Sequence, residues 1–147
     1  MRFHTIAILA ASLTALVAVP ANGKEIVVQM KNAGAAGSMV FEPSFIKAAP
    51  GDTIRFKPTD PSHNAETMPT LLPAGATPMK GAMSKEVTMA VTKAGLYGVK
   101  CMPHYSMGMV ALVQVGKPSA ADIAAAKAVK LPPLAAKRMG AMLAGVK

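Results

Sequence analysis

The residues best suited to carry chemistry in this sequence lie in one short stretch, Cys101-Met-Pro-His104-Tyr-Ser-Met-Gly-Met109. A thiolate, an imidazole and a thioether follow one another at Cys-x2-His-x4-Met spacing, directly after an apolar, strand-like run. Two imidazoles, one thiolate and a weak axial thioether are the ligands of a blue-copper electron-transfer centre. The stretch therefore predicts a copper site that needs one more histidine from elsewhere in the chain.

That second imidazole has a single candidate. The chain holds three histidines, and His4 lies in a predicted export signal, which leaves His63, 38 residues before the cysteine. Taken alone, His63 would be a surface-loop residue, and Asn64 beside it either a turn residue or a hydrogen-bond partner of the ligands. The set becomes complete only when His63 joins Cys101 and His104.

The sulfur ligands also have alternatives. Cys101 is the only cysteine, so it cannot form an internal disulfide, and as an exposed thiol outside the cytoplasm it would be oxidised. It could be a small buried hydrophobe, but its spacing to His104 favours a ligand. Met107 competes for the axial position with Met109, which is preferred because Gly108 gives the turn slack. Other methionines are expected to be packing residues: Met68, Met79, Met83 and Met89.

Residues 1–23 have the pattern of an export signal. Arg2 supplies the positive start, residues 5–19 form a run of apolar and small residues, and Ala21-Asn22-Gly23 is a small-x-small cleavage site. The run is too short to span a bilayer comfortably, and no stop-transfer charges follow it. We expect an exported protein, periplasmic if the host has two membranes, whose mature chain begins near Lys24.

The charge balance is strongly basic. The whole chain carries a net charge of +9, and Arg2 is the only charged residue of the predicted signal, which leaves +8. Such an excess steers acidic partners toward the protein. Nucleic acid is a poor candidate partner, because the lysines are scattered, only Arg55 and Arg138 remain after cleavage, and aromatic residues for base stacking make up 4% of the chain.

The region from residue 25 to 115 reads as short strands separated by turn residues, which predicts a β-sandwich or barrel. The segment from 58 to 85 lacks this pattern and is expected to be functional or to contain a helical turn. The strands are expected at 26–30, 38–41, 44–47, 53–57, 86–91, 96–100 and 110–115.

The tail changes to helical patterning. Ser119 can cap a helix over 120–129, with Asp122 in its first turn. Pro132-Pro133 interrupts, and a second helix is expected over 134–143. Helices this short would be marginal alone, so we expect them to dock on the sandwich through an apolar face that comprises Leu131, Leu134, Met139, Met142 and Leu143.

These features together resemble the pseudoazurins, small blue copper proteins of the cupredoxin superfamily. The ligand loop alone is shared with plastocyanins and amicyanins, whereas two helices after the last strand are typical of pseudoazurins. The matching stretches are Met39-Val-Phe-Glu-Pro43, Pro50-Gly-Asp52, His63-Asn64, residues 99–109 and the helical tail.

The resemblance implies an all-β fold: a Greek-key sandwich of about eight strands with two short C-terminal helices. It divides the chain into a signal (1–23), a cupredoxin domain (24–118) and a helical extension (119–147) packed on the sandwich. It implies one copper ion, cycling between Cu(I) and Cu(II), held by His63, Cys101, His104 and Met109.

It further implies roles for residues around the copper. Met39 would pack near the His104 imidazole, and Asn32 would brace the cysteine loop. Independently of the resemblance, Pro103 is expected to stiffen that loop beside the sulfur, because proline has no amide donor and a fixed φ. The His104 edge would be the electron port, and Lys80 and Lys100 would belong to a lysine ring that meets acidic partners. Those partners would be a c-type cytochrome as donor and denitrification reductases, such as nitrite reductase, as acceptors.

The expected function is therefore a monomeric one-electron carrier without a substrate, a nucleic-acid partner or a membrane anchor. A copper chaperone or store is the alternative, supported by 12 methionines, but four ligands on a rigid sandwich suit retention better than release. An enzyme such as a copper nitrite reductase would need further histidines for a second copper. Both His63 and His104 are already committed, so we expect no enzymatic activity.

Overall fold

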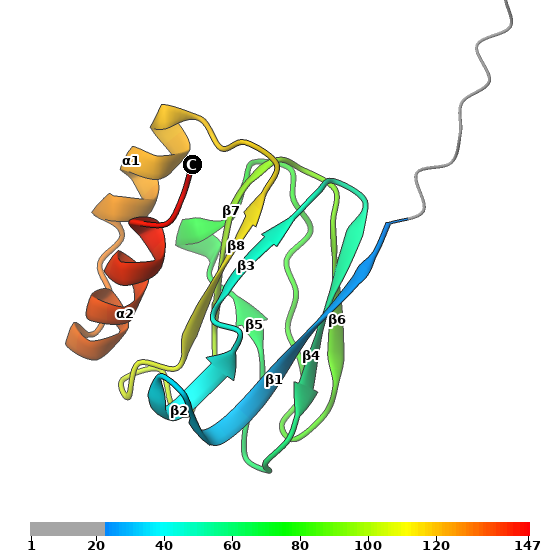
Figure 1. Cartoon of the computed structure of the whole chain (residues 1–147), viewed down its shortest axis with the longest axis vertical. Coiled ribbons are helices and arrows are strands. Elements are labelled where there is room, and N and C mark those ends of the chain that lie inside the picture. The colour runs from blue at the N-terminus through cyan, green and yellow to red at the C-terminus, as the bar shows by residue number, and fades with distance from the viewer. Residues whose placement is uncertain (1–22) are drawn as a thin grey trace, which may run out of the picture.

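The computed structural model describes residues 23–147 as two facing β-sheets with two helices against one of them (Figure 1). The predicted export signal at 1–23 falls outside the described residues except for Gly23. Within the described range, no helix combines the length and the apolar character needed to cross a membrane.

Each sheet contains four strands. The first has the order β2-β1-β4-β6 and the second the order β3-β8-β7-β5. The pairs β1·β4 and β3·β8 are parallel and the others antiparallel, since the chain crosses between the sheets. The strands are β1 (Glu25–Gly34), β2 (Gly37–Glu42), β3 (Phe45–Ala48), β4 (Asp52–Pro58), β5 (Glu66–Thr67), β6 (Val87–Val91), β7 (Gly95–Lys100) and β8 (Val110–Val115).

The predicted fold class is confirmed: a cupredoxin sandwich with two C-terminal helices. All seven strands expected from the sequence are present, and the eighth, β5, lies in the segment 58–85 together with a 3-10 turn, η1 (Pro69–Leu71). The first strand is longer than predicted, because it continues past its apolar alternation into a hairpin that pairs Gly34 with Gly37.

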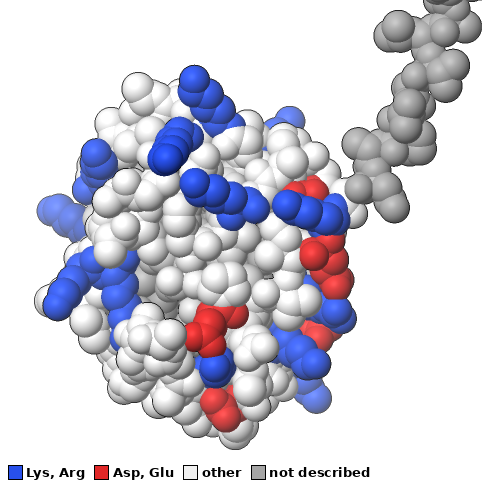
Figure 2. All heavy atoms as spheres, in the orientation of Figure 1, with Lys and Arg blue, Asp and Glu red and all other residues white. Residues whose placement is uncertain are grey.

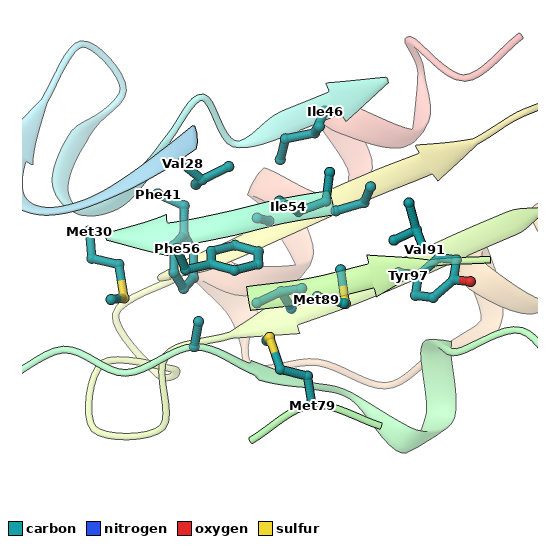
Figure 3. Packing of buried hydrophobic residues seen from close by; sticks show 14 of the residues in the cluster. Val28, Met30, Phe41, Ile46, Ile54, Phe56, Met79, Met89, Val91 and Tyr97 are labelled. Carbon is teal, nitrogen blue, oxygen red and sulfur yellow. The ribbon is translucent and has the colours of Figure 1, made fainter. Parts of the chain in front are cut away.

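The main core lies between the two sheets (Figure 3). Alternate residues of β1 and β4 point inward, as period-two patterning requires: Val28, Met30, Ile54 and Phe56 are almost fully buried. The rings of Phe41 and Phe56 meet edge to face, with centroids 5.6 Å apart. The inward-facing Met79 and Met89 fill this core as predicted.

A second apolar cluster lies between the sheet of β8 and the helices α1 (Ala120–Ala128) and α2 (Pro133–Leu143). Every residue of β8 is buried, because its two faces serve different clusters. Ala111 and Val113 face the other sheet, whereas Leu112 faces the helices.

The helical tail begins and docks largely as its sequence predicts. The Ser119 hydroxyl accepts a bond from the Asp122 amide at 3.1 Å, and the Asp122 carboxylate accepts one from the Ser119 amide at 2.8 Å. This reciprocal pair is a capping box. The buried face of α2 consists of Ala135, Met139, Met142 and Leu143. The expectation for Leu134 is wrong, because that side chain is 41% exposed and lies over Gly108 instead of the sheet.

A carboxylate anchors the turn at the start of β4. Asp52 is nearly buried and accepts bonds from the amides of Ala49 at 2.8 Å and Lys24 at 3.0 Å. The Ala49 bond is the main reason why the pKa of Asp52 lies below its ordinary value. A carboxylate with a lowered pKa stabilises the fold at pH above the unfolded value, about 3.9, and loses that contribution as pH falls through the folded pKa.

We therefore expect Asp52→Asn to lower the urea midpoint of unfolding at about pH 7 and to differ much less from the parent at about pH 2. The control is Glu25→Gln, which removes an exposed ion pair with Arg55 and should have little effect at either pH. A midpoint difference for Asp52→Asn that stays constant between these pH values would contradict this role for the carboxylate.

Candidate metal centre

The loop from Cys101 to Met109 is held closed at both ends. Cys101 directly follows β7 and Met109 directly precedes β8, and these strands pair in antiparallel register up to Lys100 and Val110. The Cys101 amide donates to the Met109 carbonyl at 3.0 Å, and the Met109 amide donates to the His104 carbonyl at 3.1 Å. The sheet thus fixes where the sulfur of Cys101 and the backbone of Met109 lie.

His63 reaches the same place from the segment between β4 and β5, three residues before β5 begins at Glu66. Its carbonyl accepts a bond from the Ser84 amide at 2.7 Å, and its side chain is fully buried. The Nδ1 atoms of His63 and His104 lie 3.1 Å apart, and Cys101 Sγ is 3.8 Å from the first and 3.6 Å from the second. Two imidazoles and a thiol thus converge on one point.

The tautomer of His63 suits a metal ligand. Its Nε2 lies 2.9 Å from the Asn32 Oδ1, an atom that can only accept, so Nε2 carries the proton and Nδ1 keeps its lone pair toward the cluster. Ligating histidines almost always donate their other ring N–H in this way. The carboxamide of Asn32 therefore contacts His63, and its expected role in bracing the cysteine loop stays a prediction.

The residue that braces the cysteine loop is Asn64. Its buried carboxamide accepts a bond from the Met102 amide at 2.7 Å and donates to the Gly81 carbonyl at 3.2 Å and to Glu66 at 3.4 Å. It therefore ties the loop after Cys101 to two other segments. The sequence left open whether Asn64 is a turn residue or a hydrogen-bond partner near the ligands, and these contacts favour the second possibility.

The methionines near the loop differ sharply in burial. Met109 is fully buried in the same core cluster as Cys101, whereas Met107 is 43% exposed, which favours Met109 as the axial ligand. Met83 was predicted to pack inside but is exposed, as is Met102. Met39 is partly buried against the main core, and its expected contact with His104 stays a prediction.

Burial shifts two of the cluster's titrations. It raises the pKa of the Cys101 thiol, an effect opposed by hydrogen bonds from the amides of Asn64 and His104. It also lowers the pKa of His63, which the nearby His104 lowers further. In the metal-free protein Cys101 is therefore a thiol at neutral pH and His63 a neutral imidazole, so metal binding must release the thiol proton.

The two predicted docking lysines flank Glu66. Lys100 pairs with it across β5 and β7, and its Nζ lies 3.4 Å from the Glu66 carboxylate and 5.1 Å from the centre of the Tyr105 ring. That side chain is only 18% exposed. Lys80 forms an isolated bridge with Glu66 through the backbone, and its side chain is exposed. Of the two, Lys80 is the freer positive charge.

The donor set fits copper. One nitrogen from each of His63 and His104 and the sulfur of Cys101 all lie within 4.8 Å of one another, and Met109 is buried in the same core cluster as Cys101. Soft sulfur ligands together with imidazole suit copper, and a thioether is not among the usual ligands of zinc. Two facing sheets that carry such a cluster at one end define a cupredoxin.

Comparison with known proteins agrees with this class. Residues 28–116 match the family described as copper binding proteins, plastocyanin/azurin family. The chain is 49% identical over 146 residues to a pseudoazurin of Paracoccus pantotrophus, with 99% of each chain covered, and 43% identical over 141 residues to that of Methylorubrum extorquens, with 95% of each covered. The crystal structure of native pseudoazurin from Hyphomicrobium denitrificans superposes with a TM-score of 0.79 at 49% identity, covering 84% of this chain and 98% of that one.

The chain belongs to the pseudoazurins, within the plastocyanin/azurin family of copper-binding proteins. It is a blue copper protein with one type 1 copper, and its function is electron transfer. The resemblance inferred from the ligand loop and the helical tail is confirmed.

Proposed function

We propose that this chain is a periplasmic carrier that takes single electrons from a donor such as a c-type cytochrome and passes them to denitrification reductases such as nitrite reductase. In this proposal residues 1–23 direct export and are removed, 24–118 form the copper domain, and 119–147 support it. The observation that carries the proposal is the convergence of His63, Cys101 and His104 on one point beside the buried Met109.

We assign the copper ligands to His63 Nδ1, Cys101 Sγ, His104 Nδ1 and the Met109 thioether. Copper, when bound, supplies the one-electron Cu(I)/Cu(II) couple. The protein contributes a rigid frame, because the Cys101–Met109 and Asn64–Met102 hydrogen bonds hold the ligands in one arrangement. A frame that does not move keeps the rearrangement that accompanies each electron transfer small.

The half-buried imidazole of His104 is the proposed electron port. Its loop neighbours Met102 and Met107 are exposed apolar side chains, and Pro103 between Met102 and His104 has no amide to donate. An exposed apolar surface of this kind suits brief, close contact with a redox partner. The absence of a further histidine for a second metal, among the three in the chain, agrees with a carrier that is not an enzyme.

Positive charge would guide that contact. Figure 2 shows basic side chains over much of the face in view, including the side that carries the helices, whereas the fewer visible acidic side chains lie at one edge and at the lower end, with basic side chains among them. A surface of this sign raises the rate of encounter with acidic partners. Lys80 is the best candidate for a direct docking charge, because Lys100 is engaged by Glu66.

The test is the rate of electron transfer to an acidic-surfaced nitrite reductase, measured by stopped flow as salt increases. We expect the second-order rate constant to fall on the order of tenfold as the Debye length shrinks from about 30 Å to about 8 Å. Lys80→Gln should slow the reaction roughly 1.5- to 5-fold at low salt, the factor for about 0.2–1 kcal/mol.

The matched control is Lys93→Gln, which removes the same charge in the turn before β7, at the end of that strand opposite Cys101. It should leave the rate nearly unchanged at low salt. A rate that does not respond to salt, or that drops equally for both variants, would argue against docking at the His104 end.

The copper-chaperone alternative draws support from the exposed Met83, Met102 and Met107, whose thioethers could present Cu(I). It is less favoured, because His63, Cys101 and Met109 are fully buried and suit retention of the metal. A chaperone would lose its copper to a competing acceptor within a single turnover, whereas a carrier keeps it through repeated reduction and oxidation.

A further inference from the structure

Arg138 of α2 connects three segments that are distant in the sequence. Its Nη1 donates to the carbonyls of Met39 at 2.8 Å and Gly108 at 2.9 Å, and its Nη2 donates to the carbonyl of Ser38 at 3.0 Å. One guanidinium thus joins the helical tail, the β1–β2 hairpin and the end of the ligand loop. Its planar fork can hold several acceptors in fixed directions, which a lysine cannot do.

Two of the carbonyls that Arg138 binds belong to residues with a positive φ. Met39 has a φ of 49° although it is not glycine, and Gly108 has a φ of 82°. Residues other than glycine keep a left-handed conformation only where their surroundings hold it. The hydrogen bond from Arg138 to the Met39 carbonyl helps to keep Met39 in this conformation. Met39 is also the residue expected to pack near His104.

Gly108 immediately precedes the proposed axial ligand. The peptide that links it to Met109 is fixed on both sides, since its carbonyl accepts from Arg138 and its amide donates to the His104 carbonyl at 3.1 Å. The helix also covers this peptide: a Cβ on Gly108 would lie 2.8 Å from Leu134 Cγ and 3.2 Å from Arg138 Cδ. The C-terminal end of the ligand loop therefore packs against α2 at Gly108.

We propose that Arg138 is a positioning residue that sets how closely the Met109 thioether approaches copper, so that the helical tail tunes the redox centre. This rests on the proposed copper ligands. In blue copper sites the axial thioether binds through a weak, long bond, and this axial ligand tunes the reduction potential. Backbone hydrogen bonds from Cys101 to Met109 and from Val110 to Gly108 already tie this end of the loop to the sheet. Arg138 adds a side-chain bond from outside the loop to the Gly108 carbonyl.

The test compares the copper-loaded parent with Arg138→Met, which keeps an apolar stem and removes the donors. We expect the thioether to move away from copper, so the visible spectrum of the copper-loaded variant should differ from that of the parent. Copper(II) affinity should fall about tenfold, the lower end of the 10- to 100-fold effect of residues that orient ligands. If Cu(I) affinity is unchanged, the potential rises by about 59 mV.

Two further variants separate positioning from charge. Lys137→Met removes an equal charge from an exposed neighbour on α2 and should match the parent. Arg138→Lys keeps the charge but loses the fork, and should resemble Arg138→Met. Parental spectrum, affinity and potential in both Arg138 variants, with only the stability of the fold lowered, would overturn the proposal, as would full rescue by lysine.

A metal-free measurement keeps this inference apart from the copper assignment. In the apoprotein, amide hydrogen exchange at Met109 should speed up about tenfold in Arg138→Lys or Arg138→Met, while exchange at Val28 in the main core stays at the parental rate. A colourless parent would count against the copper ligands, whereas unchanged exchange at Met109 would overturn the role of Arg138. Should Arg138→Met fail to fold, the lysine variant carries both readouts.

Discussion

Replacing Cys101 with serine is expected to abolish the intense visible absorption of the copper-loaded protein entirely. That absorption arises from charge transfer between the thiolate and copper, so it requires the sulfur. Serine is slightly smaller than cysteine and should fit the same buried position beside Met109. Copper affinity should also drop by more than the roughly 10- to 100-fold that is typical of residues that only orient ligands.

The matched control for this change is Met107→Ser, which alters an exposed side chain of the same loop. It should keep the colour and the affinity of the parent. Visible absorption retained in Cys101→Ser would mean that the thiolate has been assigned to the wrong residue. Copper affinity clearly lowered in Met107→Ser would count against Met109 as the axial ligand.

Asn64→Ala is expected to weaken copper binding by about 10- to 100-fold while leaving all four proposed ligands in the sequence. The change removes the acceptor of the Met102 amide and the donor to the Gly81 carbonyl. The cysteine loop then loses its hydrogen bond to the segment that carries His63. Part of the free energy of copper binding must therefore be used to order the loop, which is already ordered in the parent. Copper competition with a chelator measures the effect.

The control is Gln114→Ala, which removes another buried carboxamide far from the ligands. Its Nε2 donates to the carbonyls of Gly116 and Lys147, so the variant should unfold at lower urea and bind copper like the parent. Equal copper affinity in Asn64→Ala and the parent would show that the Met102 bond does not organise the loop.

The parts of this molecule that follow from local sequence could be predicted. Period-two alternation over 53–57 and the capping pair of Ser119 and Asp122 depend on neighbours within a few residues, and each forms the expected element. The ligand loop is local in the same sense, because Cys101, His104 and Met109 are positioned by one connection between two paired strands.

What could not be predicted depends on contacts between distant segments. β5 has only two residues and exists because Glu66 and Thr67 pair with β7. The bonds from Asn32 to His63 and from Asn64 to the Met102 amide join segments about 30 to 40 residues apart, which local pattern does not encode.

The predicted burial of one methionine and one leucine was wrong for a related reason. Apolar character alone predicted that Met83 and Leu134 would be buried, yet both lie at the end of the molecule where the ligand loop and its neighbouring segments reach the surface. The contacts of Arg138 were also missed. The available signal was that it is one of only three arginines in a lysine-rich chain, and arginine is the better choice where several carbonyls must be held at once.

The most direct test of the central claim is the visible spectrum of the purified protein with one equivalent of copper(II), followed through repeated reduction and reoxidation. A carrier with a buried thiolate–imidazole copper site should show an intense blue absorption that bleaches on reduction, returns on oxidation and survives many cycles without loss of copper. A colourless protein, or colour that disappears with release of the metal after one cycle, would contradict that claim.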